Sequence, residues 1–200
     1  VAGAYDVAIA GGVEMMRLVP MRSNRAGKDS AGPLFRERFP RGLVRQGISA
    51  ELIAVRWGLS REALDAFSLR SHACAAAAED AGITARSIVP VSIDGTEGPC
   101  VAMRDEGVRR DTSLEKLAAL KPAFIDASIA AEWPEIAWRV TAGNSSQVTD
   151  GAGAVLLAEE RVAARLGLRP RAAVTHFAVM GDDPILMLTA VMPATRRVLD

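Results

Sequence analysis

The pattern of hydrophobic and polar positions predicts strands that alternate with helices. Residues 7–10 form a short apolar run that ends at Gly11-Gly12, which is typical of a buried strand leaving its sheet through a tight turn. Apolar patterns predict further strands at residues 87–93, 153–158 and 171–179. We therefore expect an α/β domain in which a sheet interior is present from the first residues.

Helices are predicted where apolar residues recur at helical spacing between recognisable ends. Ser49 is expected to cap a helix that reaches about Trp57 and stops at Gly58. Ser60 is expected to cap a second, alanine-rich helix that stops at Gly82. Shorter helices are predicted for residues 111–120, for 159–166 before Gly167, and from 193 onward, with an irregular segment at 121–139.

Composition and charge remove several classes of partner. The 200 residues are half hydrophobic and can bury a core. Because 24 acidic residues balance 24 basic ones, no overall field attracts nucleic acid or an anionic membrane. The most apolar stretch, residues 177–195, is interrupted by charges and a proline, so it does not predict a membrane span. A soluble, cytoplasmic protein without nucleic-acid or membrane partners is expected.

Two loop regions stand out in the charge pattern. Residues 17–45 contain eight basic and two acidic side chains, a composition that most often belongs to a solvated loop but also suits an anionic ligand. Residues 141–153 are rich in small, hydroxyl and amide groups and contain no Lys, Arg, His or Cys. A ligand with an anionic end and a neutral, amide-bearing stem would fit both regions.

Side chains that could perform chemistry are few. His72 and Cys74 lie two residues apart in a predicted helix, so they point to different faces and cannot form a dyad; Cys74 is expected to be a buried thiol. Cys100 has no histidine nearby in sequence, and His176 is expected to be packed or hydrogen-bonded. No metal-ligand spacing and no glycine-rich phosphate motif occurs, so neither a metal site nor nucleotide chemistry is predicted.

Six blocks of sequence resemble, in order, the thiolases, which are acyl-CoA C-acyltransferases. The blocks are DVAIAGGVEMM, QGISAELIA, LSREALDAFSLRSHACAAAA, DEGVRRDTSLEKLAALKPAF, TAGNSSQVTDGAGAVLL and DDPILMLTAVMPATRRVL. The resemblance implies a layered αβαβα fold of two similar halves, with a loop domain inserted in the first. It places residues 1–13 and 140–166 in the N-terminal domain, 14–139 in the loop domain, and 167–200 at the start of the C-terminal domain.

The resemblance also implies a reaction. Thiolases transfer an acyl group through a nucleophilic cysteine, cleaving 3-ketoacyl-CoA or condensing acetyl-CoA, with CoA and acyl-CoA as substrates and no permanently bound cofactor. The motifs that carry the nucleophile and the C-terminal His and Cys groups are not in this chain, so no catalytic residue is predicted here. The chain is expected to begin and end within a larger core, and the intact protein to form a homodimer or homotetramer.

The same resemblance implies a CoA-binding surface. The matching positions are Arg109 near the adenine nucleotide, Phe124 along the ligand, Ala142 and Ser146 at the pantetheine arm, and Gln147 and Val148 at adjoining contacts. Small residues in this loop would allow close approach of the backbone, and the Ser146 hydroxyl can hydrogen-bond an amide.

Departures from the family pattern concern the acyl group. Arg45 and Gln46 stand where many members have His-Met and are predicted to shape the acyl pocket, and residues 125–139 are longer than the usual link. They favour a degradative thiolase, as in fatty-acid β-oxidation, for longer or bulkier acyl groups. Two alternatives stay open: a truncated, inactive segment with at most CoA-binding or assembly capacity, and a ketosynthase-like relative, which TAGNSS and PATRRVL disfavour.

Overall fold

The computed structural model describes residues 3–21, 23–29, 31–95 and 98–200. The chain divides into two compact units. One contains the described residues of 1–43 together with 148–184 and 189–200; the other contains 44–147, as far as they are described, and 185–188. All residues predicted to bind CoA except Val148, and both predicted to shape the acyl pocket, lie in the second unit.

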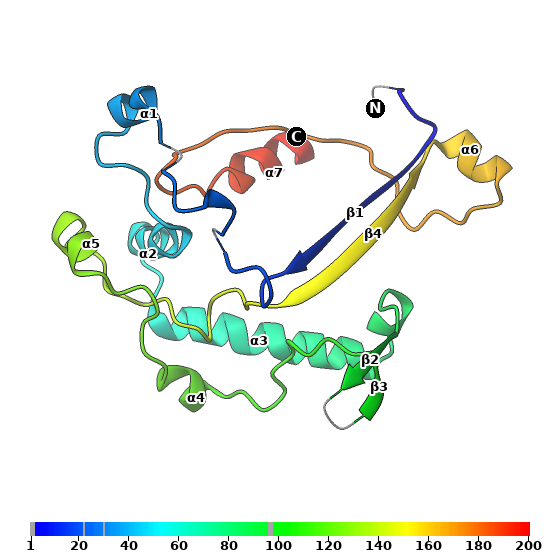
Figure 1. Cartoon of the computed structure of the whole chain (residues 1–200), viewed down its shortest axis with the longest axis horizontal. Coiled ribbons are helices and arrows are strands. Elements are labelled where there is room, and N and C mark those ends of the chain that lie inside the picture. Colours follow the sequence, from blue (N-terminus) through cyan, green and yellow to red (C-terminus); the bar gives the residue numbers. More distant parts are fainter. Residues whose placement is uncertain (1–2, 22, 30, 96–97) are drawn as a thin grey trace. The chain divides into compact units, whose positions relative to one another are not determined.

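The first unit is built on a long antiparallel ribbon of two strands (Figure 1). Strand β1 (Val7–Met15) pairs with β4 (Asp150–Ala158), from Val7 opposite Ala158 to Met15 opposite Asp150. The prediction that the first strand ends at Gly11-Gly12 is wrong, because both glycines are paired within the ribbon. A Cβ at Gly11 would lie 2.9 Å from the Gly153 carbonyl oxygen, so glycine permits close strand approach here.

Neither strand of the ribbon is buried. All nine residues of each strand are exposed, so the prediction of a buried strand is wrong for the described chain. The unit also contains η1 (Ser23–Arg25), α1 (Pro33–Arg38), α6 (Glu160–Arg165) and α7 (Val191–Leu199). The last two confirm predicted helices. Residues 171–179 form no strand, since no described segment pairs with them.

The second unit is mainly helical. Its elements are α2 (Gln46–Arg56), α3 (Arg61–Asp80), η2 (Thr84–Arg86), β2 (Val91–Gly95), β3 (Gly98–Ala102), α4 (Leu114–Ala118) and α5 (Ala127–Glu132). Helix α4 packs along the long helix α3, and β2 and β3 form a hairpin (Figure 1). Neither β3 nor α5 was among the predicted elements; the first turn of α5 is capped by the Asp126 carboxylate.

The helix ends test the predicted caps. The Ser60 hydroxyl accepts a hydrogen bond from the Ala63 amide at 3.2 Å, and Gly58 and Gly82 adopt φ values of 61° and 69°, which confirms the predicted ends. The predicted Ser49 cap is wrong. Ser49 lies inside α2, fully buried, and its hydroxyl donates to the Ile185 carbonyl at 2.6 Å, because a tertiary partner is available on that face.

A hydrophobic cluster holds the second unit together. Its buried members are Ile48 and Leu52 of α2, Ile136, and Leu186. The partly buried residues around them are Val44, Ile53, Phe124, Ile129, Trp133, Trp138 and Ile185. The segment 125–139 therefore supplies part of this core.

Candidate functional site

The neutral loop after residue 140 has an inner and an outer side. Thr141 is fully buried and forms a bridge with Pro122, and Ser145 is half-buried. Ala142 and Ser146 are exposed. The loop is thus anchored through some of its polar residues and presents others to the surroundings.

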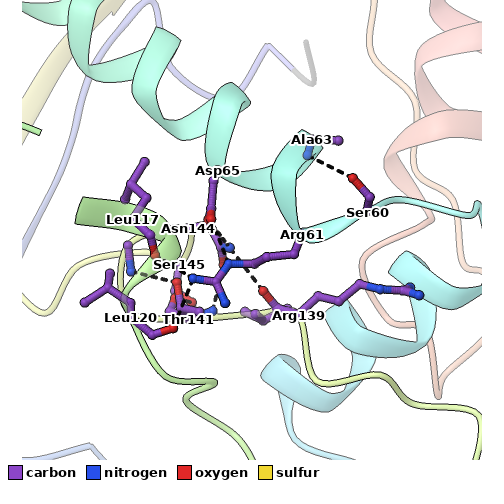
Figure 2. A network of polar contacts seen from close by, with 12 residues as sticks. Ser60, Arg61, Ala63, Asp65, Leu117, Leu120, Arg139, Thr141, Asn144 and Ser145 are labelled. Atoms are coloured by element: carbon purple, nitrogen blue, oxygen red, sulfur yellow. Dashed lines mark hydrogen bonds and ion pairs between the residues drawn. The ribbon is translucent and has the colours of Figure 1, made fainter. Parts of the chain in front are cut away.

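Asn144 organises the anchored side of the loop (Figure 2). Its Oδ1 accepts the Thr141 amide at 2.8 Å, while its Nδ2 donates to Asp65 Oδ1 at 2.9 Å and to the Arg139 carbonyl at 3.2 Å. The Ser145 hydroxyl donates to the Thr141 carbonyl at 2.5 Å. One side chain therefore closes the turn and attaches it to helix α3.

The attachment on α3 is a buried ion pair. Asp65 is 3% exposed and its Oδ2 lies 2.7 Å from Arg61 Nε, at the i,i+4 spacing of a helix. Arg61 Nη2 also donates to the carbonyls of Leu117 and Leu120, at 2.5 and 3.0 Å (Figure 2). A buried pair persists where further hydrogen bonds compensate for lost hydration, and here those bonds join α3, the end of α4 and the neutral loop.

A second buried carboxylate supports the residues that enter the loop. Glu51 of α2 is fully buried, and its two oxygens accept the amides of Val140 at 2.7 Å and Arg139 at 2.8 Å. Glu51, Asn144 and the Arg61–Asp65 pair were not among the residues predicted from the sequence. The sequence does contain a signal that Glu51 is buried. The residue lies next to Leu52 and three residues after Ile48, on the apolar face of its helix.

Close packing beneath the loop depends on a glycine. A Cβ at Gly143 would lie 2.5 Å from Leu117 Cδ2 and 2.6 Å from Leu120 Cδ1, distances that real side chains do not tolerate. Glycine therefore lets the loop rest directly on the leucines at the end of α4.

The two residues predicted to shape the acyl pocket lie at the start of α2. Arg45 is the N-cap residue and Gln46 the first residue of the helix, and both side chains are exposed. Gly47 follows Gln46 in α2, and the half-buried Phe124 packs against it. A Cβ at Gly47 would lie 2.6 Å from three carbons of the Phe124 ring. The structure thus brings Phe124 and the start of α2 together.

Gly47→Ala is expected to destabilise the second unit by about 1–3 kcal/mol, because the new methyl group would overlap the Phe124 ring. Chemical denaturation of the intact protein measures this change. Gly181→Ala is the matched control, since no atom lies within 4 Å of its Cβ position. A Gly47→Ala variant as stable as the control would contradict the predicted contact.

Arg109 lies in a different part of the second unit. Its side chain is exposed, and its backbone amide donates to His72 Nδ1 of α3 at 3.1 Å. Gln147 is half-buried, and its Nε2 donates to the Gly107 carbonyl at 2.6 Å. The end of the neutral loop and the Arg109 segment are therefore joined directly.

The neighbouring arginine has another role. Arg110 forms ion pairs with Glu79 and, at 2.9 Å, with Asp80 at the end of α3. The hydrogen bond that Arg110 donates lowers the pKa of the Asp80 carboxyl, and the bonds that Asp80 and Glu79 accept raise the pKa of the Arg110 guanidinium. Arg110 is thus an anchor for the segment.

Val148 is 66% exposed and begins the part of the first unit that contains β4. The structure groups the predicted site residues of the second unit into three places. Gln147 lies with the Arg109 segment, Phe124 lies with the start of α2, and Ala142 and Ser146 lie on the exposed side of the loop.

The remaining candidates do not form a reactive centre. Cys74 is exposed, so the expectation of a buried thiol is wrong, and the imidazole beside it in sequence contacts the Arg109 backbone. Cys100 is exposed on β3, and His176 is exposed rather than packed. Within the described ranges, no three His, Cys, Asp or Glu side chains are grouped to hold a metal ion, and no helix has the length and hydropathy of a membrane span.

The chain belongs to the thiolase family. The family model described as the thiolase N-terminal domain matches residues 1–161. The fold is similar to that of an acetyl-CoA acetyltransferase from Syntrophomonas wolfei, with a TM-score of 0.74 and 32% identity over 97% of this chain and 48% of that one. These matches confirm the predicted thiolase-like α/β fold, of which the chain comprises a part.

Relatives with related names match the whole chain. It is 38% identical, over 100% of its length, to a steroid 3-ketoacyl-CoA thiolase of Mycobacterium tuberculosis, and 39% identical, over 98%, to a 3-ketoacyl-CoA thiolase of Bacillus subtilis. It is 37% identical to a 3-oxoadipyl-CoA/3-oxo-5,6-dehydrosuberyl-CoA thiolase of Escherichia coli. The chain covers 47%, 49% and 51% of these three proteins, about half of each.

Proposed function

We propose that this chain is the CoA-binding portion of a thiolase that transfers acyl groups between CoA and acyl-CoA thioesters. The observation that carries the proposal is the neutral loop, which is fixed by buried hydrogen bonds while Ala142 and Ser146 remain exposed. A loop held in this way can present small side chains and backbone groups to the pantetheine arm without being ordered first, which favours binding.

The phosphate-bearing end of CoA would be bound by the segment that contains Arg109. Arg109 is exposed, and its guanidinium is suited to the phosphate groups of the nucleotide. Phe124 would line the ligand, and Arg45 and Gln46 would contact the acyl group. No residue of this chain is assigned to bond making; that role is proposed for the family's nucleophilic cysteine, in a motif that lies outside this sequence.

The proposed reaction is thiolysis of 3-ketoacyl-CoA, in the degradative direction, with condensation as its reverse. The names of the relatives support a CoA thioester substrate, because they include steroid 3-ketoacyl-CoA and 3-ketoacyl-CoA thiolases. The exposed Arg45-Gln46 pair at the start of α2, in place of His-Met, supports a longer or bulkier acyl group. The proposal keeps the predicted domain boundaries. Residues 1–13 and 140–166 belong to the N-terminal domain, 14–139 to the loop domain, and 167–200 to the start of the C-terminal domain.

Arg109→Gln tests the proposal. In the intact protein that carries this chain, we expect CoA-dependent thiolysis of 3-ketoacyl-CoA. In the variant, we expect about a tenfold higher KM for CoA with little change in kcat, because a charged contact to phosphate is lost. Cys74→Ala, an exposed substitution outside the proposed surface, is the control. Absence of thiolysis by the unmodified protein would instead support the inactive-segment alternative.

Assembly and location belong to the same proposal. We propose a homodimer or homotetramer in the cytoplasm, which sedimentation and cell fractionation would test. A rat relative, 40% identical over 92% of the chain, is named a peroxisomal 3-ketoacyl-CoA thiolase, so fractionation should include organelles where the source cell has them.

A further inference from the structure

We infer that His72 and Gln147 are positioning residues that together hold the backbone of residues 107–109, so that the Arg109 guanidinium is presented to the phosphates of CoA. The inference rests on the proposed function, which it extends to two side chains that hold the segment. It follows from three anchors on one short segment and from the contrast between its two adjacent arginines.

The first anchor comes from α3. His72 is half-buried, and its Nδ1 lies 3.1 Å from the Arg109 amide nitrogen. Because that amide donates, Nδ1 must be the unprotonated nitrogen of a neutral imidazole. The bond crosses 37 residues of sequence, so it fixes the Arg109 backbone relative to a long and well-formed helix.

The second anchor comes from the neutral loop. Gln147 Nε2 donates to the Gly107 carbonyl at 2.6 Å, and the Gly107 amide donates to Asp105 Oδ1 at 2.8 Å. A Cβ at Gly107 would lie 3.4 Å from the polar atoms of the Gln147 amide, which shows how closely the side chain follows this turn. The primary amide of Gln147 is therefore already engaged in the protein, so holding this turn is a role it performs before any ligand binds.

The third anchor leaves one arginine for the ligand. Arg110 is paired with Glu79 and Asp80, which fixes the segment beyond Arg109. The guanidinium of Arg109 makes no hydrogen bond or ion pair with the residues that the structure describes. Of these two adjacent arginines, Arg110 anchors the segment and Arg109 faces outward.

Preorganisation predicts a loss of affinity when an anchor is removed, because the segment must then be ordered on binding. In the intact protein, His72→Leu is expected to raise the Kd for CoA about three- to tenfold, the range expected for one lost hydrogen bond. His72→Asn should restore most of the affinity, since its Oδ1 can accept the Arg109 amide near the position of Nδ1. Pantetheine, which lacks the phosphates, should bind all variants equally.

Calorimetric titrations with CoA and with pantetheine give these values, and Cys74→Ala on the same helix is the control. Gln147→Met gives a second, independent test, because it removes the donor to Gly107 and keeps the length of the side chain. If it weakened pantetheine and CoA binding equally, Gln147 would be a direct ligand contact and the inference would be overturned for it. Normal CoA binding by both His72→Leu and Gln147→Met would overturn the inference as a whole.

The outcomes separate the inference from the proposed function. An unmodified protein that does not bind CoA would refute the proposed function itself. A His72→Leu protein that unfolds at a much lower temperature and is not restored by His72→Asn would show a general structural role, and would overturn the positioning role. The expected result is a Kd for CoA raised about three- to tenfold only in the Leu and Met variants, with kcat retained at saturating CoA.

Discussion

Glu51→Ala is expected to lower the free energy of unfolding by about 3 kcal/mol. The substitution removes the only acceptors that the described structure offers to the Arg139 and Val140 amides, so two buried or half-buried donors lose their partner. Urea denaturation of the intact protein gives the free energy, and hydrogen exchange at these two amides shows whether the loss is local.

Glu51→Gln is the matched variant. Its amide oxygen can still accept one of the two bonds, whereas its NH₂ group would face the other amide, so about half of the loss is expected. If Glu51→Ala were as stable as the unmodified protein, the buried carboxylate would not be the support for residues 139–140 that its geometry indicates.

Asn144→Ala is expected to cost about 2–3 kcal/mol and to weaken CoA binding as well. The change leaves the Thr141 amide and the Arg139 carbonyl without the bonds that close the turn, and Asp65 Oδ1 without the bond that joins the loop to α3. Denaturation measures the stability, and titration with CoA measures the affinity. The two effects should occur together, because the same bonds fix the exposed part of the loop.

Two variants sharpen the Asn144 test. Asn144→Asp keeps an acceptor for the Thr141 amide but places a second carboxylate against Asp65, so it should be at least as unstable as Asn144→Ala near neutral pH. Ser146→Ala changes an exposed residue of the same loop and should leave stability unchanged. Equal stability of Asn144→Ala and Ser146→Ala would contradict the anchoring role.

Prediction from sequence succeeded where a short segment contains its own signal. The hydroxyl of Ser60 caps a helix through an amide three residues away, and Gly58 and Gly82 end helices through their own φ angles. The order of six sequence blocks also identified the family and the fold, which the matches to thiolases confirm.

The failures share a cause. The first strand continues through Gly11-Gly12 because β4, more than 130 residues away, provides a partner along its whole length. Ser49 turns from a helix cap to the Ile185 carbonyl, 136 residues distant, because that partner exists only in the folded unit. Local patterns contain no information on such partners.

The amino-acid sequence by itself determined the helix ends at Gly58, Ser60 and Gly82, the family, and the list of residues proposed to meet CoA, because each depends on a few neighbouring side chains or on an ordered set of motifs. Only the tertiary structure decided which polar groups are anchors and which are exposed. Glu51 accepts the amides of residues 88 and 89 positions away, Asn144 donates to a carboxylate 79 positions away, and His72 accepts an amide 37 positions away. Those bonds form only when α2, α3 and the loops have packed together.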